Sequence, residues 1–187
     1  MVDIIERKTL HSGYLTVEAI KVRLSDGTEV GREVESHGDA VAVLPYDPVR
    51  RCALTVSLFR APVYTVSGAE ALEEACAGMI DAGESADTAL KREAYEELGV
   101  VLSELEPIAR LYSTPGISTE RISLFLARYA PGDRVGAGGG AAGEHENITV
   151  NERPLTELAA DADAARIEDA QLFQLVLALR LRHPELF

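Results

Sequence analysis

The sequence predicts a mixed α/β domain in which helices cover the faces of mixed β-sheets. Three observations lead to this fold class: short segments rich in β-branched residues dominate the first half, one amphipathic helix follows them, and two further strands precede helical patterning at the C-terminus. Elements of this kind bury their apolar faces by stacking in layers. The 187 residues, of which 47% are hydrophobic, suffice for one domain of ordinary size, with or without a small appendage.

Strand-like segments follow one another ahead of the helix. Residues 14–24 alternate between apolar and polar, and Gly27 marks a turn into a second segment over 28–36, as in a hairpin. Further strands are expected over 40–44, 52–59 and 72–79, with a turn over 45–48 and a looser stretch over 61–70.

The spacing of apolar residues predicts a helix over 86–98. Ser85 suits the N-cap position, and Gly99 suits the left-handed position that commonly ends a helix. Three apolar residues at positions i, i+4 and i+8 form a stripe that should face the sheet: Leu90, Ala94 and Leu98.

The second half contains strands, one glycine-rich segment and two helices. Strands are expected over 108–113, 121–129 and 148–151, and helices over 154–161 and 168–182. Residues 131–143 are rich in Gly and Ala, which predicts a flexible loop. No Gly-Lys-Ser/Thr sequence follows it, so the loop is not a P-loop.

Composition and charge exclude several classes of protein. With 31 acidic and 18 basic residues, the net charge of −13 argues against a nucleic-acid-binding surface but not against a small phosphate substrate, because a metal ion can supply positive charge. The N-terminus carries charges where a signal peptide needs apolar residues, and no apolar run of about 18 residues occurs. The sequence therefore predicts a cytoplasmic protein without a membrane span. Cys52 and Cys76, both in apolar runs, are expected to be buried thiols.

Three carboxylates share one face of the predicted helix. Glu93 lies three and four residues before Glu96 and Glu97, a spacing at which like charges cost about 0.2–0.5 kcal/mol per pair. The last turn of a helix also disfavours carboxylates because of the helix dipole. Either the helix is simply a solvated acidic one, or a bound divalent cation such as Mg²⁺ removes the conflict, since Mg²⁺ prefers carboxylate oxygens and recruits phosphates.

The same residues belong to a longer pattern. It runs Gly78-x5-Glu84-x7-Arg92-Glu93-Ala94-x-Glu96-Glu97-x-Gly99-Val100. This pattern resembles the Nudix box of the Nudix hydrolases, with every charged and glycine position filled. Ala94 departs from it, since the family prefers a larger aliphatic residue there, and this departure concerns helix packing rather than metal binding.

The resemblance extends over most of the chain. The segments 73–78, 112–120 and 144–148, with the glycine-rich loop, resemble the branch that acts on nucleoside diphosphate sugars. Within that branch they are most similar to GDP-mannose pyrophosphatases, with ADP-ribose pyrophosphatases as close relatives. The resemblance implies a Nudix α/β/α sandwich over 40–187, preceded by an N-terminal strand region over 1–39 that is exchanged in a homodimer.

The resemblance also assigns roles around a metal. It implies that Glu93, Glu97 and the Ala77 carbonyl bind Mg²⁺, with Mn²⁺ able to substitute, and that Glu96 adds a direct or outer contact. Arg92 would orient these acids, and Glu84 would have a structural or outer role. In the resemblance, Glu146 aligns with the loop metal ligand and Glu144 with the catalytic base of some ADP-ribose enzymes, and the assignment between these two roles stays open.

Five residues match positions that contact the substrate in the family: Tyr14, Arg32, Glu33, Arg60 and Glu120. Tyr14 would stack on the base, Arg60 would act across the dimer, and Glu120 would lie near the terminal sugar. Two departures weaken the assignment of the substrate. Ser57-Leu58 stand where relatives often have Arg-Gln, and Gln171 replaces a common lysine.

The implied reaction is Mg²⁺-dependent attack of water on the diphosphate of a nucleoside diphosphate sugar such as GDP-mannose, giving a nucleoside monophosphate and a sugar phosphate. Two alternatives remain. One is hydrolysis of ADP-ribose to AMP and ribose 5-phosphate. The other is a Nudix-fold sensor that binds a nucleotide without cleaving it, although sensors tend to lose box carboxylates and none is lost here.

Overall fold

The computed structural model describes residues 1–141 and 147–187. The chain divides into two compact units, which are described separately. The first comprises Met1–Asp39 and Arg110–Ile122, and the second comprises Ala40–Ala109 and Ser123–Phe187. No helix in the described part of the chain is long and apolar enough to cross a membrane.

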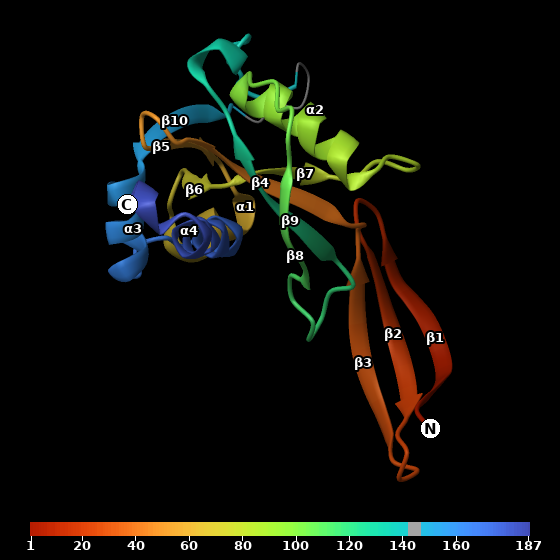
Figure 1. Ribbon diagram of the computed structural model, residues 1–187. Coiled ribbons are helices and arrows are strands. Elements are labelled where there is room, and N and C mark those ends of the chain that lie inside the picture. Colours follow the sequence, from red (N-terminus) through yellow and green to blue (C-terminus); the bar gives the residue numbers. More distant parts are fainter. Residues whose placement is uncertain (142–146) are drawn as a thin grey trace. The chain divides into compact units, whose positions relative to one another are not determined.

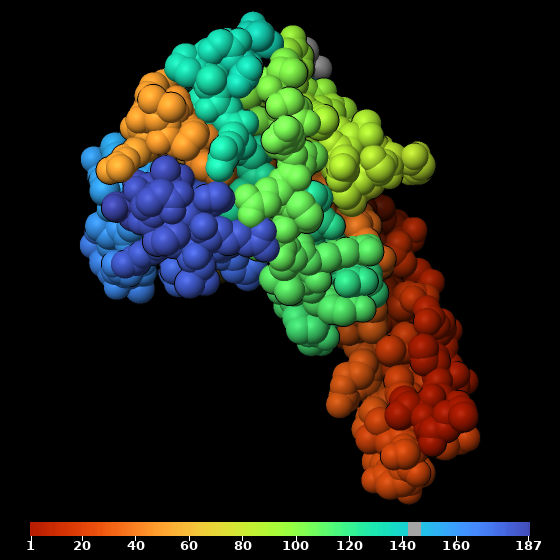
Figure 2. Space-filling model, viewed as in Figure 1, coloured from red at the N-terminus to blue at the C-terminus, as the bar shows by residue number. Residues whose placement is uncertain are grey.

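The first unit contains a three-stranded antiparallel sheet (Figure 1). Its strands lie in the order β1 (Asp3–Ser12), β2 (Thr16–Arg23) and β3 (Glu29–Ser36), and Gly27 makes the turn between β2 and β3 as predicted. In the space-filling view the three strands make one continuous exposed surface, coloured red to orange (Figure 2). Strand β1 was not predicted, because all ten of its residues are exposed and they lack the alternation that marks a half-buried strand.

The second unit is built on a sheet with the path β10-β5-β4-β9-β8, to which β6 and β7 add by pairing with β5 and β4. The strands of this sheet are β4 (Ala40–Asp47), β5 (Cys52–Leu58), β6 (Leu72–Glu74), β7 (Cys76–Met79), β8 (Glu106–Tyr112), β9 (Arg121–Arg128) and β10 (Thr149–Pro154). The end of β8 from residue 110 and the start of β9 up to residue 122 belong to the first unit. The turn expected over 45–48 was placed too early. Strand β4 continues to Asp47, whose carboxylate accepts the N–H groups of Val49 and Arg50 at 2.8 and 3.0 Å and so forms the turn.

Strands β4 and β5 separate soon after their turn, and this separation splits the sheet. They pair at Tyr46 and Asp47, and beyond that point β5 pairs with β6 while β4 pairs with β7. Ala75 lies at the crossing between β6 and β7, and its N–H donates to the Asp169 carboxylate at 3.2 Å. Asp169 also caps the C-terminal helix through the N–H of Leu172, at 2.8 Å. Burial raises the pKa of this carboxyl.

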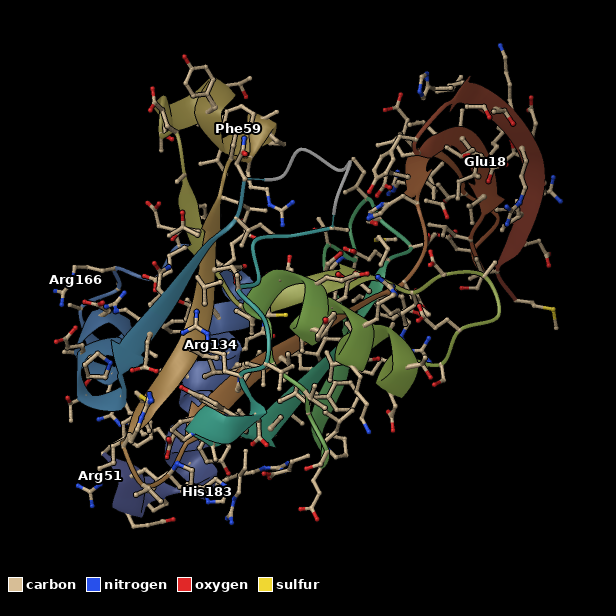
Figure 3. All side chains as sticks on the ribbon, turned by 90° about the horizontal axis from the view of Figure 1, so that it is seen from above. Glu18, Arg51, Phe59, Arg134, Arg166 and His183 are labelled. Carbon is tan, nitrogen blue, oxygen red and sulfur yellow. The ribbon has the colours of Figure 1, made fainter. Side chains whose placement is uncertain are left out.

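Helices cover both faces of the second unit's sheet. They are α1 (Ala61–Ser67), α2 (Ala86–Leu98), α3 (Leu155–Asp163) and α4 (Ala170–Arg182), with 3₁₀ turns η1 (Pro131–Asp133) and η2 (Pro184–Leu186). Val41 and Val43 of β4 join the core under α2, while Ala42 and Leu44, which point to the opposite face, are also fully buried. Figures 1 and 3 show α2 and α4 on different sides of β4. The predicted α/β/α layering is confirmed.

Helix α2 has the predicted bounds. The Ser85 side chain caps it by accepting the N–H of Thr88 at 3.2 Å, and Gly99 ends it with a φ of 70°. The predicted stripe of Leu90, Ala94 and Leu98 is fully buried. Helix α1, in contrast, lies where a looser stretch was expected, although Pro62 and Gly68 are typical start and stop residues for a helix.

The glycine-rich segment is not a free loop over its whole length, which corrects the prediction for 131–143. Its main-chain N–H groups bind the carbonyls at the end of α2: Val135 and Gly136 donate to Gly99 at 2.9 and 3.0 Å, Gly139 to Glu97 at 2.8 Å, and Gly140 to Glu96 at 3.0 Å. A Cβ at Gly138 would lie 2.3 Å from the Glu97 carbonyl oxygen. The glycines therefore permit close packing and satisfy carbonyls that a helix end leaves open.

Candidate active site

The end of α2 places a buried carboxylate against strand β7. Glu97 is 4% exposed, and its Oε2 accepts the main-chain N–H of Ala77 at 3.1 Å. The predicted carboxylate ligand and the predicted main-chain ligand are therefore neighbours, although they are 20 residues apart in the chain. The N–H donors of Gly139 and Gly140 also offset the negative end of the helix dipole near Glu96 and Glu97.

Glu93 lies directly over the main chain of Gly78. A Cβ built on Gly78 would be 1.9 Å from Oε1 of Glu93, so the carboxylate occupies the space that any larger residue at position 78 would fill. The glycine of the sequence pattern is explained by this close approach rather than by a special backbone angle. Glu93 and Glu97 thus converge on consecutive residues of β7, Ala77 and Gly78.

One guanidinium holds three carboxylates of the sequence pattern. Arg92 donates to both oxygens of Glu84 at 3.3 and 3.1 Å, to Glu93 at 2.7 Å and to Glu96 at 3.2 Å. It also donates to the carbonyl of Met79 at 3.1 Å. The hydrogen bond from Arg92 holds the pKa of Glu84 below its usual range. This geometry fits the orienting role that the sequence resemblance implies for Arg92.

Replacing Arg92 with Lys is expected to lower activity and metal affinity about 10- to 100-fold, the usual cost of removing an outer contact of a metal ligand. A lysine keeps the positive charge but cannot bind Glu84, Glu93 and Glu96 at once, because it lacks the planar fork. Titration with Mn²⁺, followed by its electron paramagnetic resonance, measures the affinity. Lys91→Arg on the same helix is the matched control, and unchanged Mn²⁺ binding in Arg92→Lys would contradict the orienting role.

Cys76 adds a neighbour of Glu97 that the sequence did not reveal. The thiol is buried as predicted, and burial together with the nearby carboxylates of Glu97 and Glu93 raises its pKa well above the usual value. The neutral thiol can donate a hydrogen bond to Glu97. Cys76 lies near α2 because β7 pairs with β4, and this pairing cannot be predicted from the residues around Cys76 alone.

These residues fit a hard divalent cation. The groups available to bind a metal are carboxylate oxygens, which Mg²⁺ and Mn²⁺ prefer as ligands. These carboxylates lie close to the main chain of β7 at Ala77 and Gly78. Within residues 1–141 and 147–187, no three His, Cys, Asp or Glu side chains gather closely enough to hold a metal by themselves. The two other predicted participants, Glu144 and Glu146, lie outside the described residues.

The predicted substrate residues are distributed over both units. In the first unit, Arg32 and Glu33 line a cavity of about 590 Å³ together with Tyr112, Arg121 and residues 115–119. Tyr14 is 84% exposed, and Glu120 directly follows the cavity-lining loop. Arg60, in the second unit, forms a bidentate ion pair with Glu74, and both of its hydrogen bonds measure 2.8 Å.

The layered fold and the acidic end of α2 define a hydrolase of the Nudix class. The NUDIX domain matches residues 36–176, and the chain belongs to this family. Family members use divalent metal ions. Relatives that align with nearly the whole chain are pyrophosphatases, and their similarity shows that the chain is a Nudix pyrophosphatase.

Two curated relatives and one solved structure illustrate the similarity. The ADP-ribose pyrophosphatase of Escherichia coli (strain K12) is 32% identical, over 99% of this chain and 90% of the relative. The GDP-mannose pyrophosphatase of Cronobacter sakazakii (strain ATCC BAA-894) is 34% identical, over 97% and 96%. The crystal structure of an ADP compounds hydrolase has a TM-score of 0.79, at 19% identity over 98% of this chain and 95% of that one, and shows the same fold.

Proposed function

We propose that the protein hydrolyses the diphosphate of a nucleoside diphosphate sugar of the GDP-mannose type in the presence of Mg²⁺. The products would be a nucleoside monophosphate and a sugar phosphate. The observation that carries the proposal is the convergence of Glu93 and Glu97 on Ala77 and Gly78. The name of the Cronobacter sakazakii relative supports the choice of substrate.

The site residues have separate proposed roles in metal binding, positioning and proton transfer. Glu93, Glu97 and the Ala77 carbonyl would hold Mg²⁺, which when bound offsets phosphate charge and lowers the pKa of water. Arg92 fixes the carboxylates in position, and Cys76 and the Ala77 N–H orient Glu97. Glu144 or Glu146 would take the proton of the attacking water.

We also propose that residues 1–39 are exchanged between the subunits of a homodimer. No hydrophobic side chain of this segment is buried within the chain, and Ile4 and Leu10 of β1 are 50% and 49% exposed. An antiparallel sheet needs an apolar face covered to be stable. A mass of twice the 20.1 kDa chain by light scattering would agree with this proposal, and a monomer would contradict it.

The second candidate substrate is ADP-ribose, cleaved to AMP and ribose 5-phosphate. Similarity over 99% of the chain to an enzyme named ADP-ribose pyrophosphatase favours it. A non-catalytic sensor is disfavoured, because all four carboxylates of the box are present and Arg92 binds three of them, Glu84, Glu93 and Glu96.

Incubation with GDP-mannose, ADP-ribose and related sugar nucleotides in Mg²⁺ tests the proposal. We expect GMP from GDP-mannose with the highest kcat/KM, and activity that disappears when the metal is chelated. Release of AMP from ADP-ribose alone would overturn the order of the two candidates. Binding without turnover of any of these compounds would support the sensor instead.

A further inference from the structure

His37, immediately after β3, lies between two carboxylates of the first unit. Its Nδ1 contacts Glu35 of β3, and its Nε2 lies 3.3 Å from Oε1 of Glu120, which is 83 residues away in the chain. All three side chains are largely sheltered, with 20%, 17% and 14% of His37, Glu35 and Glu120 exposed. This triad was not apparent from the sequence, where only Glu120 was singled out.

The two contacts together favour the protonated, positively charged form of the imidazole. A neutral histidine carries one N–H donor and one lone pair, so one of its nitrogens would face a carboxylate with a lone pair. Only the imidazolium donates from both nitrogens. The hydrogen bond to Glu35 and the charges of both carboxylates accordingly raise the pKa of His37.

The triad connects β3 to the loop that lines the cavity of the first unit. The Glu35 N–H donates to the Ile117 carbonyl at 2.8 Å, and the Glu35 carbonyl accepts the Thr119 N–H at 3.0 Å. Ile117 and Thr119 face the same cavity as Arg32 and Glu33. His37 adds a side-chain contact at the end of this loop, through Glu120.

We propose that protonated His37 is a positioning residue for substrate binding: it holds Glu120 and the loop over 113–120 against β3 and so maintains the cavity for the sugar nucleotide. The inference rests on the proposed function, because it assumes that this cavity receives the substrate. Among the described residues, three titratable groups face the imidazole: Glu35 from β3, Glu120 from the loop and Tyr14, whose ring stacks on His37 at 6.2 Å between centroids and 24° between planes.

The proposal gives substrate affinity a defined pH dependence. Because the pKa of His37 is raised in the folded protein, its contribution is complete at lower pH and is lost as the pH rises through that raised pKa. Over a pH range that starts at 6.5, the ordinary pKa of histidine, and extends above it, KM should therefore increase with pH, separately from any effect of the catalytic base on kcat.

Three variants of the full-length protein test the proposal with the sugar nucleotide that it hydrolyses best. His37→Gln should raise KM about tenfold at the lower pH while changing kcat little, since it loses hydrogen bonds to charged groups. His37→Lys keeps a cation with several donors and should give a low KM that no longer depends on pH in this range. His11→Gln, on β1 of the same sheet, should behave like the parent protein.

Nitrogen-15 NMR of the imidazoles gives a readout that needs no turnover. Both nitrogens of His37 should be mostly protonated at pH 6.5, the ordinary pKa of histidine, and its titration midpoint should lie above that value. A neutral His37, or a KM in His37→Gln that matches the parent protein at every pH, would overturn the inference. Failure to hydrolyse any sugar nucleotide would instead count against the proposed function, while the NMR result would still decide the charge of His37.

Discussion

Replacing Glu97 with Gln is expected to reduce kcat at least about a hundredfold at saturating Mg²⁺. A metal ion contributes several kcal/mol of charge stabilisation to phosphoryl chemistry, and each 1.36 kcal/mol is a factor of ten in rate. Glu97 is buried and fixed by the Ala77 N–H, so no solvent-exposed acid can move into its place without disturbing the core. Steady-state release of the nucleoside monophosphate measures the loss.

The amide of glutamine preserves the shape of the side chain, which separates the loss of charge from the loss of packing. Asp87→Asn, in the first turn of the same helix, is the matched control and should retain normal turnover. Mn²⁺ affinity should fall together with kcat in Glu97→Gln. Normal turnover in that variant, with saturating Mg²⁺, would remove Glu97 from the metal site.

Replacing Gly78 with Ala is also expected to lower activity, although it changes no charge. The added methyl group would lie 1.9 Å from Oε1 of Glu93, so the carboxylate must leave its position over β7. Its distance from Glu97 and its hydrogen bond to Arg92 then change together. We expect kcat and Mn²⁺ affinity to fall by at least about tenfold, since displacing a ligand costs as much as disturbing its outer contacts.

The double variant Gly78→Ala with Glu93→Gln makes this explanation specific. If the methyl group acts only by displacing Glu93, the two changes will not add, and the double variant will resemble Glu93→Gln alone. Gly132→Ala is the control, because a Cβ there meets no atom within 4 Å. Additive losses would show that Gly78 acts through the fold of β7 and not through Glu93.

Local signals in the sequence were sufficient for α2 and its carboxylates. The Ser85 cap, the Gly99 terminus and the apolar stripe each depend on residues a few positions apart, so the helix has the predicted bounds. Arg92 reaches Glu96 at the i,i+4 spacing that the sequence indicated. These features do not depend on contacts with distant parts of the chain, and they could therefore be predicted from the sequence.

Features that depend on distant parts of the chain were not predictable in the same way. The glycines over 136–140 indicated flexibility, yet the same absence of a Cβ lets this segment approach the end of α2. Composition cannot distinguish these two uses of glycine. The pairing of His37 with Glu120 spans 83 residues, and β1 lacks the apolar alternation by which strands are identified.

The hydrogen bond between Asp169 and Ala75 connects the start of the C-terminal helix to the main chain beside the proposed metal ligands. Asp169 holds a peptide group two residues from Ala77, whose carbonyl is the proposed main-chain ligand. Deleting Asp169 together with α4, which it caps, would leave the buried N–H of Ala75 without an acceptor, at a cost of about 1–3 kcal/mol. A shortened chain that ends before residue 169 is therefore expected to lose activity, because Asp169 and the helix that it caps hold the main chain two residues before the proposed ligand at Ala77.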